Sequence, residues 1–173
     1  DASVPADAAL PPPPPCLDLA GLDEAAPWPT FRRCQSRAGC SPNLGPASGI
    51  VAWSEPIDTE LLGVAIGSDG RIYGPSTDPG LASARDPDTG EELVRFDCDD
   101  ALGFGGFPTL GPGGEVWIPT PRGVNLFEPD GSSILGMGGT QSPTAGSPIV
   151  RGQFLSLVLG GGLHNGDAYL HTI

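Results

Sequence analysis

Short apolar runs alternate with turns rich in glycine and proline from about residue 50 onward. Four of these runs, which we expect to be strands, lie at residues 62–66, 71–73, 81–84 and 93–96. Asp-Gly in the turn at residues 67–70 supplies a positive φ at little cost, and Pro87 and Gly90 suit a second turn at residues 86–90. The pattern predicts a four-stranded antiparallel sheet, preceded by a further strand at residues 50–53.

The same order of strands and turns recurs later in the chain. Gly67 and Tyr73 correspond to Gly111 and Trp117 at a shared offset of 44 residues, and a third copy begins near residue 147. A period in the low forties with four short strands is the spacing of a β-propeller blade. The sequence therefore predicts an all-β fold, a partial β-propeller of two full four-stranded antiparallel blades plus partial blades. Because the pattern stops within a blade, we expect one unpaired sheet edge.

Residues 1–26 lack this pattern and are rich in alanine, proline and aspartate, with an unbroken proline run at residues 11–15. Consecutive prolines favour the extended polyproline II conformation, which buries little surface. We therefore expect residues 1–26 to be a disordered tether or linker that ends in a short helical turn near Leu22. The partial propeller is expected to occupy residues 27–173. The alternative is that the prolines are a ligand for an aromatic-lined groove.

Charge and hydropathy narrow the classes of partner. The net charge is −13, which repels phosphate backbones and disfavours nucleic-acid binding. No run of about 18 apolar residues is present, so no membrane-spanning segment is expected. The first residue is Asp1 rather than methionine, so we expect a processed or excised product, with any signal peptide or lipid anchor outside this chain.

The chain has four cysteines, and an even number fits an oxidising compartment: Cys16, Cys34, Cys40 and Cys98. Of the three pairings that four cysteines allow, we favour Cys34 with Cys40, which close a local loop. Cys16 with Cys98 would then staple the N-terminal arm to the remainder. The alternative, a structural zinc site, is disfavoured because the paired CxxC spacing is missing.

Three segments occur in an order that a known family shares. Residues 28–33 read Trp-Pro-Thr-Phe-Arg-Arg, residues 65–73 contain the first hairpin turn, and residues 84–91 read Ala-Arg-Asp-Pro-Asp-Thr-Gly-Glu. They resemble the entry segment, the inner-strand hairpin and the tryptophan-docking turn (AxDxxTGxxxW) of quinoprotein-like (PQQ-like) β-propeller repeat proteins. The resemblance covers about residues 28–173. Val94 stands where the docking motif has its tryptophan.

The resemblance implies one of two kinds of protein. Dehydrogenases of the family bind pyrroloquinoline quinone and calcium and use an aspartate base, and none of those positions can be matched to a residue of this chain. A second branch lacks the cofactor and acts as scaffolds, including an outer-membrane assembly lipoprotein. The chain is more similar to the second branch, so we expect no catalytic residue, no cofactor and no bound metal.

Several residues could carry chemistry, and each has a simpler structural interpretation. Asp97, Asp99 and Asp100 could bind Ca²⁺, but a solvated loop is favoured because no glycine-spaced series of ligands accompanies them. The turn at residues 86–90 begins like an EF-hand loop, yet its glycine comes one place early, so we expect a β-turn. Three tryptophans are expected to seal contacts between blades rather than to line a ligand cleft: Trp28, Trp53 and Trp117.

Other familiar site patterns are weak in this sequence. His164 and His171 are the two histidines, and Asp167 lies between them. Their odd spacing of seven places them on opposite faces of a strand, so no metal site is predicted. No GxSxG motif indicates a serine nucleophile. The glycine-rich segments at residues 103–106 and 160–162 lack the GK[ST] of a phosphate-binding loop.

The sequence therefore predicts a noncatalytic scaffold for protein or ligand binding. We expect it to be extracellular, periplasmic or associated with the outer membrane, with a protein as its partner and a lipid anchor as one means of attachment. One alternative is a fragment of a dehydrogenase that depends on PQQ and calcium. Another is a subunit that completes a propeller with other blades in a larger assembly.

Overall fold

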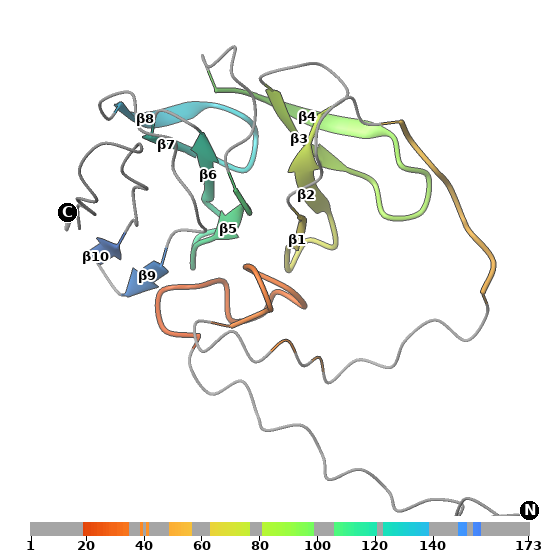
Figure 1. Ribbon diagram of the computed structural model, residues 1–173, viewed down its shortest axis with the longest axis horizontal. Coiled ribbons are helices and arrows are strands. Elements are labelled where there is room, and N and C mark those ends of the chain that lie inside the picture. The colour runs from red at the N-terminus through yellow and green to blue at the C-terminus, as the bar shows by residue number, and fades with distance from the viewer. Residues whose placement is uncertain are drawn as a thin grey trace, which may run out of the picture.

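The structure, a computed structural model, describes residues 19–34, 39, 41, 49–56, 63–76, 81–98, 106–120, 123–138, 149–151 and 154–156. Within these residues the chain is all-β and contains no helix, so none of them belongs to a helix that could cross a membrane. The strands form two four-stranded antiparallel sheets and one hairpin (Figure 1). The predicted all-β class is confirmed for this part of the chain, and the two sheets do not close into a ring.

The strands of each sheet follow one another in sequence order. The first sheet consists of β1 (Ala65–Ile66), β2 (Ile72–Pro75), β3 (Leu81–Arg85) and β4 (Glu92–Asp97). The second sheet consists of β5 (Thr109–Leu110), β6 (Val116–Thr120), β7 (Gly123–Phe127) and β8 (Ser133–Gly138). The hairpin consists of β9 (Ile149–Arg151) and β10 (Phe154–Ser156).

The two sheets pair their strands in the same register. Ala65 is paired with Tyr73 in the first sheet and Thr109 with Trp117 in the second, at the offset of 44 seen in the sequence. Each sheet also has a β-bulge where its third strand meets its fourth. Four hairpin turns contain a glycine with positive φ, which other residues adopt at a cost: Gly70, Gly90, Gly114 and Gly131. The spacing in the sequence therefore corresponds to two equivalent sheets.

The core lies between these sheets and draws on both. Its residues are Ala65, Tyr73, Ala82, Ala84, Phe96, Cys98, Leu110, Val116, Ile118 and Phe127. The rings of Phe96 and Phe127, one from each sheet, have centroids 5.3 Å apart and planes inclined by 58°. Asn125 donates a hydrogen bond of 3.1 Å to the carbonyl of Cys98 across the same junction. The sheets are thus packed face to face.

The prediction of a strand at residues 50–53 is wrong. Residues 49–56 have no regular structure, and the side chains of Ile50 and Val51 are exposed. A strand needs a neighbouring strand to satisfy its backbone groups. In this segment it is the Trp53 side chain, rather than the backbone, that contacts the first sheet.

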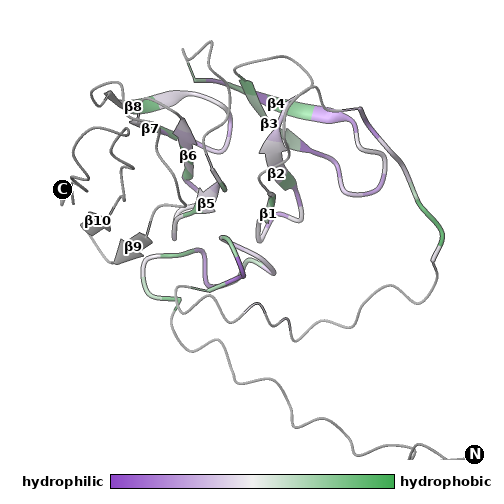
Figure 2. Cartoon of the chain, viewed as in Figure 1, coloured by the Kyte–Doolittle hydropathy of each residue, from purple (hydrophilic) through white to green (hydrophobic). Residues whose placement is uncertain are grey.

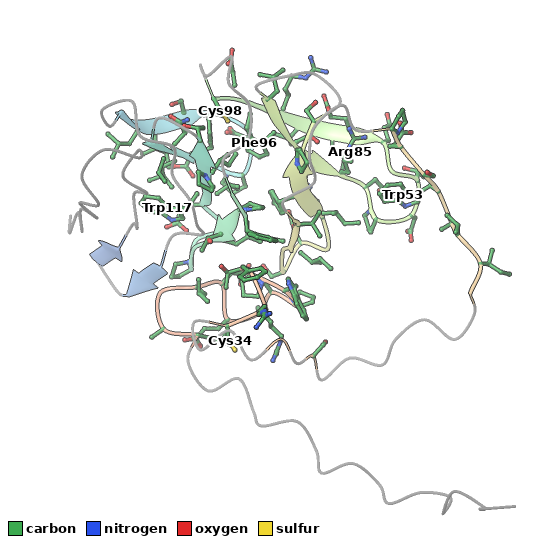
Figure 3. The ribbon with its side chains drawn as sticks, in the orientation of Figure 1. Cys34, Trp53, Arg85, Phe96, Cys98 and Trp117 are labelled. Carbon is green, nitrogen blue, oxygen red and sulfur yellow. The ribbon has the colours of Figure 1, made fainter. Side chains whose placement is uncertain are left out.

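The cysteines depart from one predicted pairing. Cys98 is buried in the core between the sheets as a thiol, with its Sγ 3.8 Å from the Phe96 carbonyl, so the predicted Cys16–Cys98 disulfide is not formed. Cys34 is buried and disulfide-bonded, and it lies far from Cys98 (Figure 3). Cys16 and Cys40 lie outside the described residues, as do residues 1–18 of the expected tether.

We expect Phe96→Ala to lower the free energy of unfolding by about 3–5 kcal/mol, because it removes a fully buried ring from the junction between the sheets. Leu93→Ala is the matched control, since Leu93 lies on the same strand and is 47% exposed, and it should cost less than about 1 kcal/mol. Urea denaturation followed by tryptophan fluorescence measures both. Equal losses for the two variants would show that the junction is not the core.

Candidate functional site

A segment that precedes both sheets crosses their first strands, β1 and β5. This segment, residues 19–34, is called the strap and is drawn in red and orange in Figure 1. Trp28 forms an antiparallel β-bridge with Ile66 of β1 through backbone hydrogen bonds of 2.8 and 3.2 Å. Figure 2 shows that the strap carries both hydrophobic and hydrophilic residues. The strap therefore pairs with the backbone groups of β1 that face away from β2.

The strap also binds the equivalent strand of the second sheet. Leu110 of β5 accepts a hydrogen bond from the N–H of Asp23 at 2.9 Å and donates one to the carbonyl of Pro29 at 2.8 Å. The hydroxyls of Thr30 and Thr109 lie 3.0 Å apart, and both residues are buried. Leu110 of β5 is equivalent to Ile66 of β1, so the strap binds equivalent positions of the two sheets.

Asp23 ties the strap to the turn between β1 and β2. Its Oδ2 accepts hydrogen bonds from the backbone N–H of Ser68 at 3.2 Å and from the Ser68 hydroxyl at 2.6 Å. Its Oδ1 accepts the N–H of Ala25 at 3.1 Å. The residue is buried, and these donors satisfy a carboxylate that would otherwise be costly to remove from water. Residues 19–26, included in the expected tether, therefore pack against the sheets.

Asp69 and Tyr73 form a second polar group at the same turn. The Tyr73 hydroxyl donates a hydrogen bond of 2.8 Å to Asp69, which also accepts the backbone N–H of Arg71 at 3.0 Å. Burial, and then the hydrogen bond to Asp69, raise the pKa of the Tyr73 phenol well above its ordinary value. The Arg71 side chain lies 3.4 Å from Asp69 and 3.5 Å from the carbonyl of Pro129 in the second sheet. The guanidinium thus links the two sheets at this edge.

A pocket of about 270 Å³ lies where the strap meets the turn between β1 and β2 and the turn between β5 and β6, which are called the inner turns. Its walls include Asp23 from the strap, residues 67–69 and Tyr73 from the first sheet, and residues 112–114 and Pro129 from the second. The lining combines two carboxylates with two hydroxyls and the rings of two prolines. The carboxylates give the lining a negative character, which is reduced where Arg71 pairs with Asp69, and the proline rings can pack against a hydrocarbon chain.

The acidic residues and histidines singled out in the sequence do not meet at this pocket. Asp97 ends β4 and is exposed. Five others lie outside the described residues: Asp99, Asp100, His164, Asp167 and His171. Two glycine-rich stretches also lie outside the described residues: residues 160–162, and residues 103–105 of the segment 103–106. In the part of the chain that is described, no three His, Cys, Asp or Glu residues are placed to share a metal ion.

The turn at residues 86–90 is a β-turn stabilised by its own first residue. Oδ1 of Asp86 accepts hydrogen bonds from the backbone N–H and the hydroxyl of Thr89 at 2.8 and 3.0 Å, and from the N–H of Asp88 at 2.9 Å. These bonds, those of Thr89 first, lower the pKa of the Asp86 carboxyl. The side chain is engaged within the turn, as expected for a β-turn rather than a calcium loop.

Trp53 packs on that turn, and the contact has a counterpart in the second sheet. The indole N–H donates a hydrogen bond of 2.8 Å to the Pro87 carbonyl, and a Cβ added to Gly90 would lie 2.6 Å from the ring. Val94 follows Trp53 by 41 residues, and its Cγ1 would lie 3.0 Å from a Cβ added to Gly131, which follows Gly90 by 41. A valine therefore takes the place of the tryptophan at the junction between the sheets.

The sequence pattern does not indicate Asp23, Ser68 or Asp69 as site residues. Asp23 lies in a segment expected to be a tether, and the other two belong to an ordinary hairpin turn. The one usable signal is the offset of 44, which implies that two equivalent inner turns lie near one another.

Comparison with known proteins identifies no relative, because no family model and no curated protein matches the chain.

We expect Tyr73→Phe to remove a pH-dependent part of the stability. The folded-state pKa of Tyr73 lies above its ordinary value of 10.0, so the unfolded chain loses this proton first as the pH rises. The stabilisation is therefore complete below pH 10 and is lost above it. Urea denaturation on both sides of pH 10 should show a steeper loss of unfolding free energy for the wild type than for the variant. Identical slopes would contradict the buried, hydrogen-bonded phenol.

Proposed function

We propose that the chain is a noncatalytic scaffold, secreted or associated with the cell envelope, that binds a protein partner. The observation that supports this proposal best is the convergence of three separate segments on one pocket. The strap, the first inner turn and the second inner turn each contribute side chains or backbone to its walls. Loops positioned by a rigid framework are the common place for recognition.

The walls of the pocket are held before any partner arrives. Asp23 accepts three hydrogen bonds, and Tyr73 and Arg71 hold the Asp69 carboxylate from two sides. Side chains that are already ordered lose little conformational entropy on binding. A pocket of this kind suits selective recognition of a single side chain of the partner.

The partner is proposed to present a basic side chain to this pocket. The chain has a net charge of −13, which favours association with a positively charged surface. Asp23 and Asp69 supply the carboxylates, and the rings of Pro112 and Pro129 can pack on the methylene groups of a lysine or arginine. The chemistry of the lining therefore favours a cationic group over an anionic or a purely apolar one.

The partial β-propeller is part of the same proposal. The resemblance of residues 28–173 to PQQ-like repeat proteins supports it, as do the shared register of the two sheets and their face-to-face packing. The contact of Trp53 with Gly90, repeated by Val94 and Gly131, adds a recurring junction between successive sheets. A scaffold built of such repeats presents its inner turns together at one rim.

We expect a blocked Gly-Arg-Gly peptide to bind weakly and to shift amide resonances of residues 67–70 and of Gly113 and Gly114 in heteronuclear NMR spectra. Asp69→Asn should weaken this binding by about tenfold, because it removes a carboxylate from the pocket. Asp88→Asn is the charge-matched control, since Asp88 is exposed in a turn outside the pocket, and it should leave binding nearly unchanged. Equal weakening by both variants would show general charge attraction and would refute the pocket.

A further inference from the structure

Cross-strand pairing shows which side chains of the first sheet share a face. Ala65, Tyr73, Ala84 and Val94 form one row across β1, β2, β3 and β4. The first three are buried, and Val94 packs against the same core. The first sheet therefore directs this row at the second sheet.

The equivalent row of the second sheet points away from the core. It begins at Thr109, which is buried next to Thr30 of the strap, and continues with Trp117, Leu126 and Leu135, which are paired with one another across β6, β7 and β8. The neighbouring positions Val116 and Phe127 belong to the core between the sheets, so the row occupies the opposite face. Trp117 and Leu126 are half-buried and Leu135 is 42% exposed. These three residues are called the apolar outer face.

The outer face of the first sheet has a different chemistry. Arg85 donates a hydrogen bond of 2.9 Å to the carbonyl of Gly90 and lies 3.5 Å from Glu92. Glu92 also accepts hydrogen bonds from Arg95 at 2.7 Å and from the Ser76 hydroxyl at 2.9 Å. Figure 3 shows Arg85 and Trp117 to either side of Phe96. The outer face of the first sheet is therefore polar, in contrast to the apolar outer face of the second.

We propose that the apolar outer face binds a third sheet of the same kind, which the β9–β10 hairpin of this chain begins. The proposal rests on the partial propeller proposed above and adds the face on which the next sheet packs. It continues an interface already present, because the row in the first sheet that corresponds to this face is the one buried against the second sheet. Burial of three large apolar side chains would supply the driving force.

The length of the connection between β8 and β9 and the recurring contact with a turn glycine both support a third sheet at this face. Residues 139–148 join β8 to β9, as residues 98–108 join β4 to β5. Trp53 and Val94 each lie against a turn glycine of the sheet that follows them. Leu135 comes 41 residues after Val94, so it is placed to contact the corresponding turn of a third sheet.

Leu135→Glu in the full chain tests this docking by hydrogen–deuterium exchange and mass spectrometry. We expect exchange in peptides that cover residues 149–156 to rise about tenfold, with peptides from residues 65–97 unchanged. Leu93→Glu is the matched control, because it makes the same chemical change at a 47% exposed residue of the equivalent bulge in the first sheet. It should leave residues 149–156 unchanged.

Equal exchange of residues 149–156 in the two variants would overturn the proposal. A dimer in sedimentation experiments that Leu135→Glu dissociates would also overturn it, because the occupant would then be a second copy. The scaffold function fails separately, through loss of arginine-peptide binding at the pocket, in which Leu135 takes no part. The two failures can therefore be told apart.

Discussion

Burial of apolar side chains between the two four-stranded sheets is the interaction on which the other features depend. A single small sheet cannot bury a face without a neighbour, and here each sheet covers one face of the other. Phe96 and Phe127 meet in this junction, while Asn125 and Arg71 make hydrogen bonds across its borders. Because the sheets share a register, packing them brings their equivalent inner turns to the same rim. The pocket exists as a consequence of that packing.

The strap adds a constraint at the inner edges of the sheets. β1 and β5 have two residues each, so few hydrogen bonds hold them, and the strap pairs with both. Asp23 links this pairing to the pocket, because its backbone N–H binds the second sheet and its carboxylate binds the turn of the first. The same segment therefore joins the sheets and forms a wall of the candidate site. A partner bound in the pocket would contact the strap and both sheets together.

The outer faces of the two sheets are formed by positions that are not equivalent, and they differ in chemistry. Arg85 and Glu92 make the outer face of the first sheet polar, whereas Trp117 and Leu135 make that of the second apolar. The two sheets therefore share their strand pairing but differ in the side chains on their outer faces. The pair of sheets therefore has one polar and one apolar outer face.

The sequence by itself determined the all-β class, the strands within residues 71–96 and the turn at residues 86–90, because apolar alternation and turn chemistry act between near neighbours. It also contained the offset of 44, and so the equivalence of the two sheets. It misplaced a strand at residues 50–53, since a strand depends on an edge to pair with, and it paired Cys98 wrongly. The tertiary structure alone decided the pocket. Asp23 and Ser68 are 45 residues apart, and only packing of the strap on both sheets brings them together.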